Sequence, residues 1–257
     1  MAWTASRRRA CRRHFLNGRT SGRIKMAKNT TSKVRILSRE SRMFADRKEA
    51  GQLLGRELRE YRGKNAVVLG IPRGGIIIAR EIALELDAEL DIVLAHKLRS
   101  PGYNELAMGS ISEDGRIFLN EEVVNELGVK QPYIDQEGKR QLAEIGRRIE
   151  MFRKGRTKVA LSGRIVIVAD DGVATGATTQ AALWSVRLEK PEKLICAIPV
   201  GPEETILRLS KDVDEMVVLR APPMFMAVGQ FYSRFYPVED EEVAEILEHE
   251  QKRISKK

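Results

Sequence analysis

The chain has few residues that support cross-links, metal clusters or membrane insertion. Its 257 residues include two cysteines, three histidines and 5% aromatic residues. Cys11 and Cys196 cannot build a disulfide framework, and Cys196 lies in an apolar run typical of a buried strand. His14, His96 and His249 are scattered, so the sequence predicts neither a Ser/His/Asp arrangement nor a metal-ligand cluster. The chain has no run of 18 apolar residues, and we expect no membrane span.

Positive charge is concentrated at the beginning of the chain. Residues 1–41 hold 12 of the 45 basic residues and one of the 36 acidic residues, which leaves the remainder close to neutral. This segment has no apolar periodicity and no secretory signal, so we expect residues 1–42 to form a disordered basic tail before one folded domain, 43–257. The tail is an organellar transit peptide, a nucleic-acid-binding arm, or sequence upstream of a start at Met26 or Met43. Without a transit peptide, the low cysteine content favours a cytoplasmic location.

The most informative segment runs from Ile165 to Thr178. Four β-branched residues predict a buried parallel strand, and two carboxylates, Asp170 and Asp171, follow where that strand ends. The next residues form a short loop of small side chains, and a predicted helix follows it. Backbone N–H groups and threonine hydroxyls at the start of a helix favour a phosphate. The carboxylates suit the hydroxyls of a sugar or a bridging metal ion, so the segment predicts a sugar-phosphate site.

Strands and helices alternate along the body, which predicts an α/β fold with a parallel sheet flanked by helices. We expect strands at 66–69, 90–95, 165–169, 194–200 and 216–219, and a hairpin over 106–118. We expect helices over 44–61, 76–86, 132–154, 203 onward and 239–249. Residues 119–158 have the pattern of an inserted helical cap with a solvated basic face, and residues 220–249 that of a small C-terminal hood.

A second loop, Gly70 to Gly75, follows the first predicted strand of the body. Its glycines permit a tight turn with inward N–H groups, and Arg73 adds a fork of donors, so the loop predicts a second anion site at the same sheet edge. A further basic segment, His96 to Gly102, follows the next strand. Its residues alone are typical of a static hairpin that exposes Lys97 and Arg99.

Together these segments resemble the type I phosphoribosyltransferases, and most closely a bacterial and archaeal subgroup of predicted members. The resemblance covers about residues 43–249 and rests on five segments: Pro72 to Gly75, Leu90–Asp91, Pro101 to Ala107, Asp170 to Thr178, and Ala227 to Gly229. It implies that the domain at 43–257 is a phosphoribosyltransferase domain. The implied donor is 5-phosphoribosyl 1-diphosphate, with Mg²⁺ held mainly through the diphosphate, and the implied assembly is a homodimer.

The resemblance also implies roles for individual residues. Asp170, Asp171, Lys97 and Arg99 would act in catalysis, the last two on a mobile loop hinged at Gly102 and Gly109. The residues implied to bind the donor are Arg73, Gly74, Gly75, Asp170, Asp171, Gly172, Val173, Ala174, Thr175, Gly176, Ala177 and Thr178.

The acceptor is less well defined by the sequence. The ring-rich stretch 225–236 offers Phe225, Phe231 and Tyr232 to stack on a base, although the same rings are equally suited to core packing. The 6-oxopurine enzymes carry an acidic residue where this chain has Ala174, so hypoxanthine and guanine are doubtful acceptors. The alternative function is a non-catalytic regulator that binds the donor and contacts nucleic acid through its basic tail or cap helix.

Overall fold

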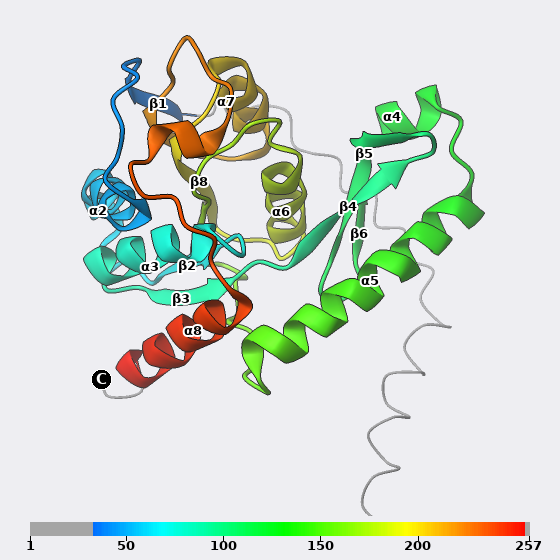
Figure 1. Ribbon diagram of the computed structural model, residues 1–257. Helices are drawn as coiled ribbons and strands as arrows, with labels where there is room; N and C mark the ends of the chain where they lie inside the picture. The colour runs from blue at the N-terminus through cyan, green and yellow to red at the C-terminus, as the bar shows by residue number, and fades with distance from the viewer. Residues whose placement is uncertain (1–32, 255–257) are drawn as a thin grey trace, which may run out of the picture. The chain divides into compact units, whose positions relative to one another are not determined.

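A computed structural model describes residues 33–254, and its centre is a six-stranded parallel sheet (Figure 1). The strand order is β1-β9-β8-β7-β2-β3, and every neighbouring pair is parallel. The strands are β1 (Lys33–Ser38), β2 (Ala66–Gly70), β3 (Glu89–Ile92), β7 (Ile165–Ala169), β8 (Lys193–Val200) and β9 (Glu215–Arg220). The parallel sheet predicted from the sequence is therefore confirmed.

Helices cover both faces of the sheet because alternate strand residues face opposite sides. Val68 and Ile167 contribute to one core, with α2 (Arg47–Glu57) and α3 (Gly75–Leu86). Val67 and Val166 contribute to the other, with α6 (Ala177–Arg187) and α7 (Glu203–Leu209). The free thiol of Cys196 is buried in this second core, as expected.

An antiparallel arm extends from the sheet after β3. Three strands form it, β4 (Ala95–Ser100), β5 (Tyr103–Ser112) and β6 (Ile117–Leu119), and the hairpin predicted over 106–118 is the β5–β6 pair. Two helices follow, α4 (Glu121–Glu126) and α5 (Gln131–Arg153). Asn120 caps α4 by accepting a hydrogen bond from the N–H of Val123. The inserted helices therefore lie along an arm that begins at residue 95, and α5 runs the length of it (Figure 1).

The expected hood divides into two parts. Residues 221–239, here called the strap, contain one turn of 3₁₀ helix at Val228–Phe231. Backbone hydrogen bonds attach the strap to the start of α2: Phe44 donates to Phe231, and Ser233 donates back to Phe44 at 2.8 Å. The final helix, α8 (Asp240–Ile254), instead packs against α5 and β3. No helix between residues 33 and 254 is long and apolar enough to cross a membrane.

The expectation of a disordered tail through residue 42 is wrong for its last part. Lys33–Ser38 form β1, which pairs with β9 at the edge of the sheet, and Val34 and Ile36 pack against the second core. The basic residues of this stretch suggested a disordered segment. In the structure the charge of Arg35 is neutralised by Glu57 and Glu215, which are distant in sequence, so the strand can form. The remainder of the expected tail, residues 1–32, lies outside the described residues.

Removal of β1 should destabilise the protein. A chain that starts at Met43 loses the ladder to β9 and two apolar side chains, which together contribute about 2 kcal/mol or more to the free energy of unfolding. For a body of this size we expect the melting temperature to fall by roughly 4–8 °C. The matched control is a chain that starts at Thr31, and equal melting temperatures of the two chains in calorimetry would contradict the stabilising role of β1.

Candidate active site

The two glycine-containing loops meet because β2 and β7 are neighbours in the sheet. Val68 pairs with Ile167 and Gly70 with Ala169, so both loops leave the same edge at the same height. The approach is close enough to require glycine. A Cβ at Gly74 would lie 1.9 Å from Oδ2 of Asp171, and one at Gly75 would lie 2.7 Å from the carbonyl oxygen of Ala169. The glycines therefore bring the first loop against the acid pair.

The acid pair is half-buried at this edge. The Asp170 carboxylate accepts hydrogen bonds from the hydroxyl of Thr179 at 3.2 Å and from the N–H of Asp171 at 2.9 Å. Burial raises the pKa of Asp170 well above its ordinary value, and the adjacent charge of Asp171 raises it further. Burial also raises the pKa of Asp171, although Arg47 opposes that rise. A cation or hydroxyl groups bound at this edge would offset the cost of burial and favour the ionised form of both carboxylates.

Arg47 is the site residue that the sequence reading missed. Its Nε donates to Oδ2 of Asp171 at 2.8 Å, and the two side chains are 10% and 16% exposed. Its Nη1 donates to the carbonyl of Tyr236 at 2.8 Å, and its guanidinium lies 3.8 Å from the centre of the Phe235 ring. Arg47 thereby connects the acid pair to the strap. The sequence does contain a sign of its burial. Arg47 lies on the same helical stripe as Ala50 and Leu54, and that stripe is otherwise apolar.

The segment between the acid pair and α6, residues 172–176, is here called the phosphate loop. Gly172 and Gly176 have φ values of 153° and 69°, and α6 begins at Ala177. Since the first N–H groups of a helix have no partner within it, those of the first turn can bind an anion. Two groups of α7 fix the loop: the hydroxyl of Thr205 donates to Ala174 at 2.8 Å, and Arg208 donates to the carbonyl of Thr175.

One residue of this loop does not fit its expected role. Val173 is buried, and its N–H donates to the carbonyl of Val200 at 3.0 Å. Neither its side chain nor its N–H is available to a phosphate, so its inclusion among the donor-binding residues is wrong. The reason is that the loop crosses the end of β8 before it turns into α6. Ala174, Thr175 and Thr178 are exposed.

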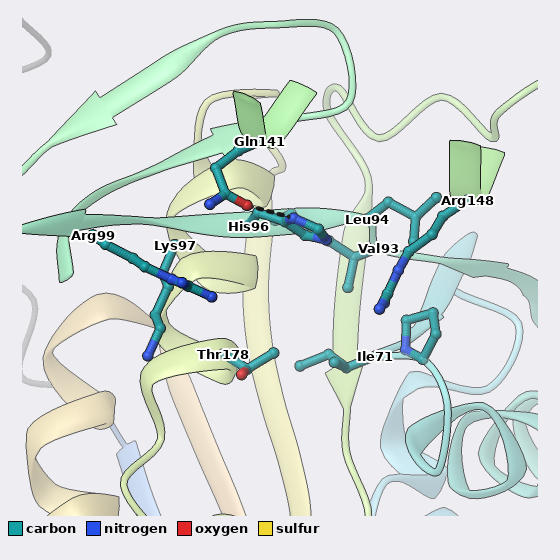
Figure 2. Close-up of a pocket in the computed structure, with 11 residues that line it drawn as sticks. Ile71, Val93, Leu94, His96, Lys97, Arg99, Gln141, Arg148 and Thr178 are labelled. Carbon is teal, nitrogen blue, oxygen red and sulfur yellow. Dashed lines mark hydrogen bonds between the residues drawn. The ribbon is translucent and has the colours of Figure 1, made fainter. Parts of the chain in front are cut away.

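The basic segment after β3 is strand β4, which pairs with β5 in a hairpin, as one of the two expected alternatives has it. Its Lys97 and Arg99 line a cavity of about 210 Å³ together with Ile71, Pro72 and Thr178 (Figure 2). The arm thus brings both cations to the same edge as the two loops. Gly102 occupies the β4–β5 turn with φ of 76°. Gly109 does not have the properties of a hinge, because it lies within paired strands and a Cβ there would lie 2.1 Å from the carbonyl oxygen of Phe118.

Arg73 and the aromatic candidates do not line the cavity, although Tyr232 contacts the acid pair, since its hydroxyl donates to the carbonyl of Asp171 at 2.6 Å. The side chain of Arg73 is 47% exposed, and its nearest recorded acid is Glu239 at 3.6 Å. Phe231 and Tyr232 are 1% and 3% exposed, so the expectation that their rings stack on a base is wrong. They pack in the core because the strap is held down by main-chain hydrogen bonds. Phe225 is half-buried and stacks on Phe231 at a ring distance of 5.3 Å.

The fold and the site define an α/β protein with a phosphate loop and an acid pair at one edge of a parallel sheet. The model of the phosphoribosyl transferase domain matches residues 44–234, and the chain belongs to this family. Two relatives from strains of Mycobacterium tuberculosis, both provisionally named phosphoribosyl transferase, are 42% identical over 207 residues, which is 80% of this chain. The chain spans about half the length of these curated relatives, 47%.

A solved structure shows the same fold. The crystal structure of TT1426 from Thermus thermophilus is 41% identical in sequence, with a TM-score of 0.76, over 80% of this chain and 97% of that one. The similarity therefore extends over nearly all of the Thermus chain.

Loss of the Arg47 guanidinium should destabilise the protein. The variant Arg47→Met leaves Asp171 without its buried partner and removes the hydrogen bond to Tyr236 of the strap, which should lower the free energy of unfolding by about 3 kcal/mol. Urea unfolding measures this difference. Lys48→Met, on the exposed neighbouring position, is the control and should have little effect, so equal unfolding of the two variants would show that the ion pair contributes nothing.

Proposed function

We propose that this chain transfers the 5-phosphoribosyl group from 5-phosphoribosyl 1-diphosphate to a nitrogen nucleophile, with release of pyrophosphate. One observation carries the proposal: the phosphate loop at the start of α6 and the acid pair lie on one sheet edge, in contact with a second glycine loop. Helix N–H groups favour the 5-phosphate, and the carboxylates favour the ribose hydroxyls. Membership of the phosphoribosyl transferase family supports the same donor.

The reaction creates positive charge on the ribose and negative charge on the diphosphate, and these residues can stabilise both charges. The bond between ribose carbon 1 and the diphosphate oxygen breaks, and a bond from the acceptor nitrogen to carbon 1 forms. Positive charge then develops on the ribose ring, where Asp170 and Asp171 would lie close to it. Negative charge develops on the leaving diphosphate, toward which Lys97 and Arg99 would project from β4. Electrostatic stabilisation of both charges is the contribution that we assign to the protein.

The acid pair fits a magnesium ion that arrives with the donor. In the described part of the chain, no three His, Cys, Asp or Glu side chains gather to hold a metal by themselves. Since Mg²⁺ prefers six oxygen ligands and usually takes several from phosphates and water, Asp170 and Asp171 would complete a coordination shell supplied mainly by the substrate. The ion, when bound, would neutralise charge on the leaving diphosphate.

The acceptor proposed is a nucleobase-like nitrogen heterocycle other than a 6-oxopurine. Ala174 provides no carboxylate at the position where the 6-oxopurine enzymes carry one. Of the three candidate rings, Phe225 is the one that remains available for stacking, because it is only partly buried at the strap. Exposed Met224 and Met226 beside it add apolar surface.

The alternative, a donor-binding regulator that contacts nucleic acid, has less support. On α5, Arg140 pairs with Glu137 and Arg147 with Glu144, so this helix does not present an unbroken basic stripe. The basic tail lies largely outside the described residues. The homodimer and the cytoplasmic location stay expectations from the resemblance and from composition.

Removal of the loop hydroxyls should weaken donor binding. We expect Thr175→Ala combined with Thr178→Ala to cost about 2–3 kcal/mol of binding free energy, roughly 30- to 150-fold, because hydrogen bonds to a charged phosphate are lost. Titration calorimetry with donor and Mg²⁺ measures the affinity. Thr157→Ala, at an exposed residue that lines a different cavity with Asp91 and Arg156, is the control. Unchanged affinity in the double variant would refute the assignment of residues 172–178 to the phosphate.

Acceptor preference should exclude 6-oxopurines. We expect pyrophosphate release with hypoxanthine or guanine to be slower than with at least one other nitrogen heterocycle from a panel, since no carboxylate replaces Ala174. Efficient turnover of hypoxanthine would disprove this preference. Donor binding without turnover of any base would favour the regulator.

A further inference from the structure

The cavity beside the acid pair is unusually cationic. Its lining includes Lys97 and Arg99 from β4 and Arg148 from α5, while none of its lining residues in the described part of the chain is acidic (Figure 2). Pro72 and Thr178 close it from the sides of the two loops. A wall that brings three cations together and whose described lining has no acidic residue is suited to a ligand with several negative charges.

Arg148 has a different environment from Arg147, the arginine that precedes it on α5. Arg147 is 57% exposed and pairs with Glu144 at 2.7 Å, whereas the Nε of Arg148 is 3.5 Å from that carboxylate and its side chain lines the cavity. Arg99 contributes a further sign of an anion site, since its Nε is buried and has no hydrogen-bond partner among the side chains that the structure describes. A buried guanidinium donor without an acceptor is costly, and an incoming anion would satisfy it.

His96 lies in the same wall with a defined tautomer. The side-chain amide of Gln141 donates to Glu137 at 2.8 Å, so its oxygen is directed to Nδ1 of His96, 2.9 Å away. An amide oxygen only accepts hydrogen bonds, and Nδ1 therefore carries the proton in neutral His96. Nε2 is left with a lone pair on the side of the ring away from Gln141, where the ring borders the cavity (Figure 2).

The surroundings of His96 favour its neutral form before a ligand binds. Burial lowers its pKa below the ordinary value, and the charges of Arg148 and Arg99 lower it further. The hydrogen bond that Nδ1 of His96 donates to Gln141 and the charge of Glu144 oppose this effect. Lys97 on β4 is the remaining charged group of the cavity wall, while the loop residues and Thr178 are uncharged.

We propose that this cavity holds the diphosphate of the donor, that Arg148 of the inserted helix binds it directly, and that His96 takes up a proton on Nε2 when it binds. This proposal rests on the proposed function and adds a binding group and a proton to it. The lone pair of neutral His96 would face anionic oxygens, whereas the protonated ring donates a hydrogen bond to them. The proton comes from solvent, and it returns there when pyrophosphate leaves.

The sign of the pH dependence follows from the two states of His96. The bound diphosphate raises the pKa of His96 relative to the free protein. The contribution of His96 to donor affinity is therefore fully present below the pKa that His96 has in the free protein. It is lost as the pH rises through the pKa that His96 has in the complex. The donor titrates in the same range, but that contribution is shared by all variants and cancels in comparisons among them.

Three ligands and two matched arginine variants test the cavity assignment. We expect Arg148→Ala to weaken binding of pyrophosphate and of the donor 10- to 100-fold, and to leave ribose 5-phosphate, which lacks the diphosphate, within twofold of wild type. Arg147→Ala should leave all three within twofold. Melting temperatures check that both variants fold. Equal affinities for Arg148→Ala and Arg147→Ala would overturn the proposal.

Proton uptake tests His96 independently. Calorimetry of donor binding at pH 7.5 in buffers of different ionisation enthalpy should show more proton uptake in wild type than in His96→Asn. In Gln141→Leu the neutral ring is free to carry its proton on Nε2, so uptake should fall while affinity at pH 8 is retained. A merely structural role for Gln141 would lower affinity without changing uptake. Equal uptake in wild type and His96→Asn would overturn the role of His96.

The outcomes separate this proposal from the function on which it rests. Wild type that binds the donor through Thr175 and Thr178, with no effect of Arg148→Ala, leaves the proposed function intact and refutes the cavity assignment. Wild type that binds neither donor nor pyrophosphate refutes both.

Discussion

The contact of Gly74 with Asp171 is the constraint on which the rest of the site depends. It exists because β2 and β7 are paired in register, so that two loops leave the sheet at one height. No side chain fits at Gly74, and the carboxylate that fills this space must be neutralised by a partner on the remaining side. Arg47 provides that charge from α2, and its second donor reaches the strap. A single close approach between two loops thereby leads to contacts that connect the acid pair to α2 and to the strap.

Sheet and loops were predictable because they depend on local patterns. Alternation of apolar runs with helical stripes requires only the neighbouring residues, and the segment from Ile165 to Thr178 contains its strand, acid pair, loop and helix in one stretch. The strap was not predictable in the same way. Phe231 and Tyr232 have the composition of a stacking platform, and only their main-chain pairing with Phe44, distant in sequence, places them in the core. Strand β1 was hidden for a similar reason, since Arg35 is neutralised by acids far along the chain.

The two adjacent arginines of α5 show the limit of what a charge pattern in a sequence can predict. Arg147 and Arg148 are adjacent, and a solvated face is the ordinary interpretation of such a run. Successive residues on a helix differ in direction by about 100°, so that one of the pair reaches solvent and the other borders the cavity. Which of them does so depends on the packing of α5 along the arm, and no pattern within 131–153 specifies that packing.

The attachment of the strap by main-chain hydrogen bonds has an evolutionary consequence. Backbone N–H and carbonyl groups are the same for nearly every residue, so the bonds between Phe44 and residues 231 and 233 do not depend on side-chain identity. The exposed side chains of the strap, Met224 and Met226 among them, can be exchanged by mutation while the strap keeps its position. The loops beneath it tolerate no such exchange at Gly74 or Gly75. Sequence changes in proteins with this fold are therefore expected to accumulate in the strap, where a new acceptor specificity can arise without loss of the fold.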